Sequence, residues 1–343
     1  MQREAPAFWW EKAGWKALAL SPLSALYGAI AGRRLMKSVP PAVALPVLCI
    51  GNLTVGGAGK TPTAIAFARA AKGLGLKPGI VSRGYGGAFK GTHRVDPARD
   101  DASLVGDEPM LLAAHAPVAV SANRLEAAQL LQRQGCDFII MDDGFQSARL
   151  HVDYALIVID ARRGIGNGHV LPAGPLRAPL ASQLLKLDAV LKIGVSGAAD
   201  ATIRQASRAA KPIYEAKLQA SRTVSLKGRK FLAFAGIGDP GKFFDTVTAS
   251  GGELVARRGF PDHHPYTEQE ISELLGSAST AGAELITTSK DHVRLAGLGL
   301  SPDVRKKIAV LEVELVFETL DTPERIIHQT LERCRLRRLA HHK

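Results

Sequence analysis

One short segment of this chain has the residue types and spacing of a loop that binds phosphate groups. Glycines let backbone N–H groups turn toward phosphate oxygens, a lysine can reach the β- and γ-phosphates, and a following hydroxyl can ligate Mg²⁺. The generic pattern begins with glycine, where this chain has Thr54, but its Gly-Lys-Thr ending is intact. The segment predicts a nucleoside triphosphate site, in which Lys60 holds phosphates and Thr61 holds the metal. The predicted loop consists of Thr54, Val55, Gly56, Gly57, Ala58, Gly59, Lys60 and Thr61.

Two acidic residues follow an apolar run further along the chain and are candidates for the Mg²⁺ site. Residues 138–141 read Phe-Ile-Ile-Met, and Asp142 and Asp143 come directly after them. In phosphate-loop enzymes, a carboxylate near the loop helps to hold the metal beside the phosphates. We therefore expect Asp142 to bind Mg²⁺, directly or through water, and Asp143 to belong to the same site and face the phosphates.

A phosphate loop does not name a reaction, and a kinase also needs an acceptor site with a carboxylate base. Asp107 and Glu108 stand at the predicted start of a helix, where an acid can take a proton or simply cap the helix. Residues 260–266 contain Asp-His-His, and a lone histidine there can equally be structural. The stretch 166–177 is rich in glycine and proline and ends in Arg177, whose guanidinium suits a phosphate.

The elements that must position these residues alternate in the manner of parallel βαβ units. Apolar runs predict strands at 47–50, 79–82, 118–121, 138–141, 155–159 and 189–193, with helices at 63–74, 108–114 and 124–134. A second series of strands is predicted at 230–235, 253–257, 285–288 and 308–313, followed by a helix at 323–339. The expected fold class is α/β, with a P-loop NTPase-like parallel sheet domain and a smaller α/β domain.

Residues 8–31 form a mostly apolar segment that contains all three tryptophans of the chain. A membrane-spanning helix needs about 20 consecutive apolar residues, and Lys16 and Pro22 interrupt this run. Acidic residues near the start and the phosphate loop downstream disfavour a secretory signal. Two readings remain, a helix on the membrane surface with basic residues at lipid headgroups and a helix packed on the protein itself. We favour the membrane-surface helix.

The predicted organisation therefore has three parts. We expect residues 1–36 to form the N-terminal amphipathic, membrane-associating helix, residues 37–220 the P-loop domain that binds the nucleoside triphosphate, as a kinase domain would, and residues 221–343 the smaller α/β domain, which would close over the active site.

Composition restricts the classes of protein and partner. Of 343 residues, 46% are hydrophobic and 22% charged, as in a globular chain. Three cysteines without a C-x-x-C pair disfavour a disulfide framework or a cysteine zinc site, and they favour a reducing compartment. The net charge of +12 favours a polyanionic partner, whether nucleic acid, an anionic membrane or a phosphorylated substrate. Aromatic residues make up only 6%, which disfavours a surface built on base stacking.

Seven short motifs occur in order along the chain and together resemble the tetraacyldisaccharide 4'-kinase family. They are TVGGAGKTP (54–62), SRGYGG (82–87), GDEP (106–109), DDGFQ (142–146), GNG–LPAGPLR (166–177), FPDHH (260–264) and TTSKD (287–291). Each motif alone is moderately specific, whereas the ordered set is highly specific.

The resemblance implies a lipid A kinase that transfers the γ-phosphate of ATP to the 4'-hydroxyl of tetraacyldisaccharide 1-phosphate and requires Mg²⁺. It implies Asp107 as general base, His263 as its assisting partner and Lys60 as a third catalytic residue. The expected location is the cytoplasmic face of the bacterial inner membrane, as a peripheral or monotopic protein. The expected partners are the lipid substrate and this membrane face, with no nucleic acid and no obligate protein partner.

Further residues are expected to contact the substrate: Arg83, Asn123, Arg124, Gln146, Asn167 and Arg177. The chain departs from the family pattern at three positions, with Ala178 and Ser289 in place of expected acids and Ser147 in place of a frequent histidine. None of the three lies in the phosphate loop or in the pair of Asp107 and His263. We expect them to alter substrate contacts more than the activity itself.

Three rival functions fit the sequence less well. A GTPase or metallochaperone switch should carry Asn-Lys-x-Asp, but residues 289–291 lack the asparagine and the spacing. A soluble kinase for a small metabolite would not need the tryptophan-rich N-terminus. A non-catalytic membrane module would leave Lys60, Asp107 and Asp142 unexplained.

Overall fold

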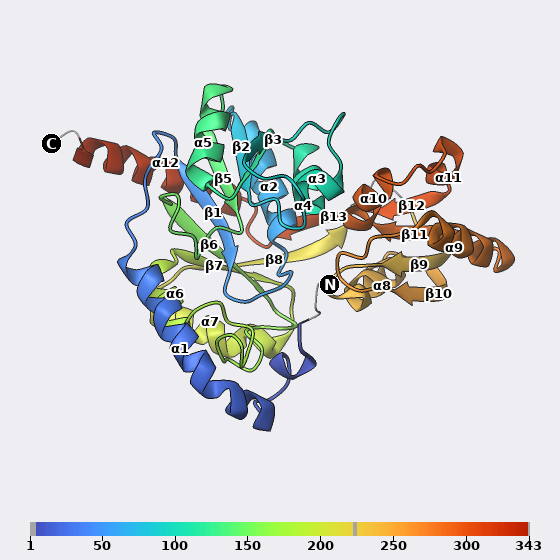
Figure 1. Ribbon diagram of the computed structural model, residues 1–343, viewed down its shortest axis with the longest axis horizontal. Coiled ribbons are helices and arrows are strands. Elements are labelled where there is room, and N and C mark those ends of the chain that lie inside the picture. The colour runs from blue at the N-terminus through green and yellow to red at the C-terminus, as the bar shows by residue number, and fades with distance from the viewer. Residues whose placement is uncertain (1–4, 222–224, 342–343) are drawn as a thin grey trace.

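The computed structural model describes residues 5–221 and 225–341 and contains two α/β units (Figure 1). Residues 1–4 of the predicted N-terminal segment lie outside the described residues. A helix near the N-terminus lies along one side of the larger unit.

The larger unit is built on a sheet of nine strands in the described residues, with the order β13-β8-β7-β6-β1-β5-β2-β4-β3. Its inner strands run parallel, whereas β3 and β13 pair antiparallel with their neighbours at the two edges. The carboxyl ends of the parallel strands meet at one side of the sheet, where α/β folds bind their ligands. The strands are β1 (Val47–Asn52), β2 (Pro78–Ser82), β3 (Thr92–Arg94), β4 (Val118–Ser121), β5 (Phe138–Asp142), β6 (Tyr154–Asp160), β7 (Ala189–Ile193), β8 (Ile213–Ala220) and β13 (Val313–Phe317).

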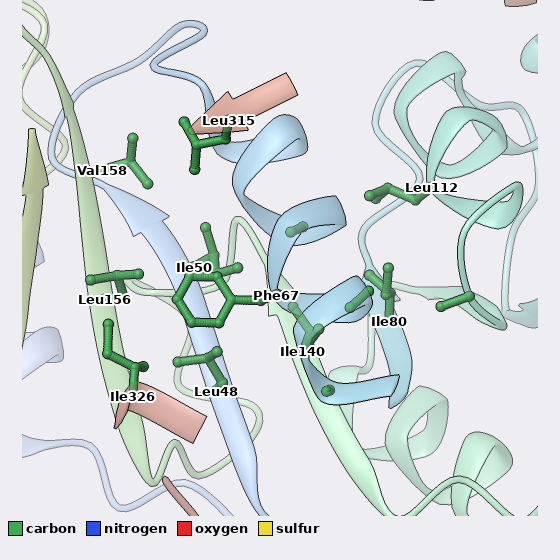
Figure 2. Packing of buried hydrophobic residues seen from close by; sticks show 14 of the residues in the cluster. Leu48, Ile50, Phe67, Ile80, Leu112, Ile140, Leu156, Val158, Leu315 and Ile326 are labelled. Atoms are coloured by element: carbon green, nitrogen blue, oxygen red, sulfur yellow. The ribbon is translucent and has the colours of Figure 1, made fainter. Parts of the chain in front are cut away.

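Helices cover both faces of this sheet, which explains why its strands are continuously apolar. Leu48 and Ile50 of β1 pack on the face covered by α2, α4 and α12, around Phe67 (Figure 2). Val47 and Cys49 pack on the opposite face, with α5, α6 and α7. The helices of this unit are α2 (Lys60–Gly73), α3 (Ala102–Val105), α4 (Asp107–Ala113), α5 (Arg124–Arg133), α6 (Leu180–Lys186), the 3-10 helix η2 (Gly197–Ala199), α7 (Asp200–Arg208) and α12 (Thr322–His341).

The smaller unit has a parallel sheet with the strand order β10-β9-β11-β12. Phe243 and Val247 of α8 pack on one face of this sheet, and Ile271 and Leu274 of α9 pack on the other. The elements are β9 (Lys230–Ala235), α8 (Pro240–Ala249), β10 (Glu253–Gly259), α9 (Glu268–Thr280), β11 (Glu284–Thr288), α10 (Ser289–Ala296), α11 (Pro302–Lys306) and β12 (Ile308–Leu311).

After β12 the chain returns to the larger unit, which differs from the predicted division. Sequence analysis assigned all of 221–343 to the smaller domain. In the structure β13 pairs with β8, and Leu315 and Ile326 lie in the core of the larger unit. The reason is a pairing between strands about a hundred residues apart, which the order of elements along the chain does not reveal. The smaller unit therefore ends near residue 311.

The predicted α/β class, with a parallel sheet and a second smaller sheet, is confirmed. Every strand predicted in the two series is present, and the structure adds β3, β8 and β13. The predicted C-terminal helix is α12.

The N-terminal segment folds into the 3-10 helix η1 (Ala7–Trp9) and the long helix α1 (Trp15–Lys37). One side of α1 packs on the larger unit, where Gly28 and Gly32 allow close approach to Val170 and Pro179. The other side presents apolar side chains to solvent: Trp15, Leu18, Leu23, Leu26, Tyr27 and Ile30. Within residues 5–221 and 225–341 we find no helix whose length and hydrophobicity would let it span a bilayer.

Candidate active site

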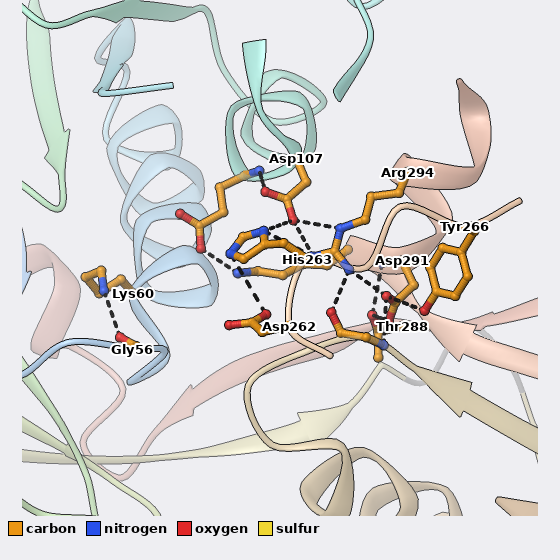
Figure 3. A network of polar contacts seen from close by, with 12 residues as sticks. Gly56, Lys60, Asp107, Asp262, His263, Tyr266, Thr288, Asp291 and Arg294 are labelled. Atoms are coloured by element: carbon orange, nitrogen blue, oxygen red, sulfur yellow. Dashed lines mark hydrogen bonds and ion pairs between the residues drawn. The ribbon is translucent and has the colours of Figure 1, made fainter. Parts of the chain in front are cut away.

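The phosphate loop lies between β1 and α2, in the strand–loop–helix setting that such a loop requires. Gly56 and Gly59 have φ angles of 101° and 94°, a region that favours glycine. A Cβ atom on Gly59 would also lie 2.7 Å from the Cδ1 atom of Ile193. Lys60 is buried and its Nζ atom lies 3.4 Å from the carbonyl oxygen of Gly56, so the lysine folds back over its own loop (Figure 3).

A second segment holds this loop in place. The backbone N–H of Val55 donates to the carbonyl oxygen of Pro175 at 2.9 Å. Arg177 donates from Nε to the carbonyl oxygen of Thr54 at 3.0 Å and forms a two-pronged ion pair with Asp143, at 2.7 and 2.9 Å. The segment 166–177, predicted as a binding loop, thus braces the phosphate loop.

Asp142 is the last residue of β5 and Asp143 follows it directly, beside the phosphate loop, because β5 pairs with β1. The Oδ1 atom of Asp142 is buried without a hydrogen-bond partner. Burial, together with the nearby Glu108 and Asp143, raises the pKa of Asp142 to about 7. The side chain of Asp143 is 31% exposed; its partial burial would raise its pKa, but Lys60 and Arg177 lower that pKa to about 2. One carboxylate therefore lacks a cation, while its neighbour is already paired.

This arrangement fits the predicted Mg²⁺ ion. Mg²⁺ sites at nucleotides commonly use one or two carboxylates and leave the remaining positions to phosphates and water. The unpartnered oxygen of Asp142 and the buried hydroxyl of Thr61 have the chemistry for such a site. Among the described residues, no group of three or more His, Cys, Asp or Glu side chains has the geometry to hold a metal by itself.

Asp107 and His263 come from different units and meet beside the cleft (Figure 3). Asp107 is the first residue of α4, and His263 follows β10 with a positive φ of 59°, a strained value typical of functional positions. The Nδ1 atom of His263 lies 3.0 Å from Oδ2 of Asp107. Burial alone would raise the pKa of Asp107, but the hydrogen bond from His263 and the charges of Lys290 and Arg294 hold it well below the usual range. The hydrogen bond to Asp107 raises the pKa of His263.

Arg294 is a site residue that sequence analysis missed. Its Nε atom lies 3.0 Å from Oδ2 of Asp107, and Nη2 contacts the same oxygen. Arg294 lies three residues beyond the TTSKD motif and one turn of α10 after Lys290. The Nζ atom of Lys290 in turn pairs with Glu108 at 2.5 Å. The helical spacing of Lys290 and Arg294 was a signal for two cations on one face. Their acidic partners are more than 180 residues away, so the sequence did not reveal the contact.

A cleft of about 2370 Å³ runs between the units and along the phosphate loop. Predicted site residues that line it are Val55, Gly56, Gly57, Gly59, Lys60, Thr61, Arg83, Arg124, Asp142, Asp143, Gln146, Arg177 and His263. Asp107 does not line the cleft and is only 4% exposed, because His263 and Arg294 contact its carboxylate. The lining residues bring a phosphate loop, a carboxylate suited to a metal and a histidine into one space.

The structure does not bring two predicted substrate residues to this cleft. The side-chain amide of Asn123 donates to Glu126 at 2.7 Å, at the start of α5. The amide of Asn167 donates to the carbonyl oxygen of Ala173 at 2.9 Å and so shapes its own loop. Both side chains have local structural partners.

The other four predicted substrate residues, Arg83, Arg124, Gln146 and Arg177, line the cleft. Gln146 donates to the carbonyl oxygen of Asn52 at 2.8 Å, near the start of the phosphate loop. The Nε atom of Arg124 is buried without a partner, and burial together with the charge of Arg83 lowers the Arg124 pKa to about 10. Two arginines close together favour an anionic group between them.

The chain matches the family described as tetraacyldisaccharide-1-P 4'-kinase over residues 16–332. It is 58% identical over 338 residues to the tetraacyldisaccharide 4'-kinase of Brucella anthropi, covering 98% of this chain and 99% of that protein. The enzyme of the same name from Brucella suis is 56% identical over the same length. Among solved structures, that of LpxK from Aquifex aeolicus, determined in complex with ATP, superposes with a TM-score of 0.71. The two chains share 26% identity, and the match covers 92% of this chain and 99% of the other.

Proposed function

Since this chain belongs to the tetraacyldisaccharide-1-P 4'-kinase family and is thereby a kinase of lipid A biosynthesis, we propose how its cleft carries out the reaction. The γ-phosphate of ATP is transferred to the 4'-hydroxyl of tetraacyldisaccharide 1-phosphate, between the phosphate loop and the pair of Asp107 and His263. The observation that carries this proposal is the contact of Asp107 with His263 across the two units, beside the cleft that the phosphate loop lines.

The triphosphate of ATP binds to the loop 54–61. The positive φ angles of its glycines, the buried Lys60 and the start of α2 support this assignment. The ATP complex of the Aquifex aeolicus protein supports it as well. Lys60 then stabilises the charge on the transferred phosphoryl group.

Asp107 acts as general base with His263 as its partner. A sugar hydroxyl becomes acidic only as its oxygen bonds to phosphorus, so a weakly basic carboxylate suffices at that stage. His263 orients the carboxylate and helps to move the proton away. The 3.0 Å contact and the lowered pKa of Asp107, which keeps it ionised, support this role.

One observation favours the opposite division of labour within the same pair. His263 lines the cleft, whereas Asp107 lies behind it. In this second candidate, His263 takes the proton at Nε2, and Asp107 fixes the ring through Nδ1, as in other aspartate–histidine pairs. The two schemes are separated by the mutant kinetics described in the Discussion.

Thr61 and Asp142 hold Mg²⁺, which supplies charge neutralisation at the phosphates. The unpartnered oxygen of Asp142 and its raised pKa support this choice over Asp143, whose two oxygens are engaged by Arg177. Asp143 keeps the neighbouring Lys60 and Arg177 in place, with its Oδ2 atom 3.8 Å from Nζ of Lys60.

The solvent-facing side of α1 docks on an anionic membrane surface, where the lipid substrate resides. Its apolar side chains and the basic residues Lys12, Lys16, Arg33 and Arg34 support an interfacial helix. In this proposal the protein is a peripheral or monotopic enzyme at the cytoplasmic face of the inner membrane.

The direct test is transfer from labelled ATP to tetraacyldisaccharide 1-phosphate in detergent micelles, with and without Mg²⁺. We expect metal-dependent product carrying the phosphate at the 4' position. We expect Lys60→Ala to abolish product, and Asp107→Asn to lower kcat strongly, leaving a measurable residual activity and intact ATP binding. Wild-type turnover in Asp107→Asn would refute the role of the pair, and product at another position would refute the proposed acceptor.

A further inference from the structure

Arg294 of α10 connects two buried carboxylates, one from each unit (Figure 3). Its side chain is 8% exposed. Nε and Nη2 donate to Oδ2 of Asp107, while Nη1 donates to Oδ1 of Asp291 at 2.7 Å. A guanidinium is planar and always charged, so contacts on two of its edges fix its orientation.

The anchor for Arg294 is itself rigid. Asp291 is fully buried and accepts hydrogen bonds from the N–H of Gly236 at 3.0 Å, from the hydroxyl of Tyr266 at 2.9 Å and from Thr288 at 2.6 Å. A buried ion pair needs such additional hydrogen bonds to offset its desolvation. The Nη1 end of Arg294 is therefore held by Asp291, which is itself fixed by these hydrogen bonds.

The same network positions His263. The carbonyl oxygen of Gly236 accepts from Nη1 of Arg294 at 2.6 Å and from the backbone N–H of His263 at 3.1 Å. Arg294 and His263 are thus attached to one carbonyl of the smaller unit, and both reach the same oxygen of Asp107 in the larger unit.

The charged groups around Asp107 and His263 influence the protonation state of both side chains. Asp107 faces His263 and Arg294 directly, with Lys290 and Glu108 nearby, and His263 also faces Asp262 at 3.9 Å. The hydrogen bond to Asp107 raises the pKa of His263 despite its burial, and the charge of Arg294 opposes this rise. The guanidinium thus favours an ionised Asp107 and a neutral His263.

We propose that Arg294 is a positioning residue for the Asp107–His263 pair, which it holds in reactive orientation and charge state only when α10 packs against α4. This inference rests on the proposed role of that pair. Because α4 belongs to the larger unit and α10 to the smaller one, the base is complete only when the two units are closed. An open enzyme would hold ATP without an organised base, which limits transfer of the phosphate to water.

The test compares the pH dependence of kcat/KM and the values of kcat and KM for wild type, Arg294→Gln and Arg294→Lys. In the Gln variant we expect kcat to fall by about tenfold or more. We also expect the acid limb, the part of the kcat/KM profile that rises with pH, to move to higher pH by about 1 pH unit. KM for ATP should change less than about threefold, because Arg294 does not line the cleft. Arg294→Lys keeps the positive charge but loses the planar set of N–H donors that contacts both Asp107 and Asp291. We therefore expect an acid limb near that of wild type and an intermediate kcat.

Arg162→Gln is the matched control, since Arg162 also pairs with an aspartate across the two units, Asp245, at 3.2 Å. Its acid limb should stay at the wild-type position. An unmoved acid limb in Arg294→Gln would reduce Arg294 to a structural contact and overturn the proposal. If that variant does not fold, wild-type kcat in Arg294→Lys overturns it equally. Asp107→Asn in the same series tests the proposed function separately from the role of Arg294. Full activity in Asp107→Asn would show that the Asp107–His263 pair is not catalytic, whatever the result for the Arg294 variants.

Discussion

Asp142 and Asp143 are adjacent in sequence yet lie in opposite electrostatic surroundings. Asp143 accepts both prongs of Arg177, while Asp142 has a buried oxygen with no partner. A buried carboxylate without a cation costs free energy, which a bound metal would offset. In the proposed metal site, Asp142 is therefore left unsatisfied in the protein alone, whereas Asp143 is not.

Replacing Asp142 should therefore separate stability from activity. We expect Asp142→Asn to lose transfer by about 100-fold or more, because the metal site loses its carboxylate, and to raise the Tm of the metal-free protein by a few degrees. Product formation from labelled ATP measures the loss of transfer, and scanning calorimetry without and with Mg²⁺ and ATP measures the change in Tm. Asp143→Asn, which breaks paired contacts, should instead lower Tm; equal Tm shifts in the two variants would contradict the assignment.

The proposed roles of Asp107 and His263 predict how the reaction depends on pH. The pKa of His263 is raised, so protonated histidine persists to a higher pH than usual, and activity that needs neutral His263 rises with pH above about 6.5. Removing the negative charge in Asp107→Asn should move this limb to lower pH while reducing kcat. A profile of kcat/KM between pH 5 and 9 measures the shift, and a limb that moves upward would contradict the coupling.

The variant that loses more kcat, Asp107→Asn or His263→Gln, identifies the general base. If Asp107 is the base, Asp107→Asn should lose more kcat than His263→Gln, because the histidine only assists. If His263 is the base, the order is reversed. Single-turnover transfer with saturating ATP compares the two, with Tm as the control for folding.

At the scale of elements, α1 has two different sides. Ser24 donates to the carbonyl oxygen of Val170 at 2.6 Å, and Gly28 and Gly32 pack on Pro179, two residues after Arg177. Leu26 and Ile30 on the other side are each 62% exposed. The helix is thus both packed on the protein and able to meet a membrane, so the two readings of the sequence are compatible.

Charges placed on the exposed side should weaken membrane binding without unfolding the helix. We expect the double variant Leu26→Glu and Ile30→Glu to bind anionic vesicles at least about tenfold more weakly. KM for the lipid should rise while KM for ATP stays constant. Leu320→Glu, at a leucine that is 84% exposed outside α1, is the matched control. Equal vesicle binding by both variants would rule out α1 as the docking surface.

At the scale of the whole molecule, ion pairs between described residues join the two units in two zones. One is formed by α4 and α10 around Asp107, and the other by the end of β6 and α8, where Lys242 pairs with Asp160. Polar interfaces of this kind permit relative motion of the units. The cleft lies between them.

We therefore expect substrates to stabilise the closed arrangement. Hydrogen exchange of α10 and of residues 260–264 should slow when ATP and the lipid acceptor are both bound, more than with ATP alone. Protection in α9, on the far side of the smaller sheet from α8, serves as the internal control. Unchanged exchange in α10 would argue against closure as part of the reaction.

Local sequence was enough to predict the phosphate loop, the strands that flank it and the α/β class, because glycine geometry and apolar runs depend on near neighbours. It also predicted Asp107, His263 and Asp142 as site residues through the ordered motifs, although their roles stay predictions. Residues whose candidate role depended only on type, such as Asn123 and Asn167, proved to have local structural partners.

Tertiary structure alone decided which distant groups meet. Arg294 contacts Asp107, which lies 187 residues earlier in the sequence. Strand β13 follows the smaller unit in the sequence but pairs with β8 of the larger unit. The different surroundings of Asp142 and Asp143 arise in the same way, since Arg177 is brought to Asp143 by a loop 34 residues later. The spacing of residues along a chain dictates helices, strands and tight loops, whereas charge pairing and burial depend on which surfaces the folded elements bring together.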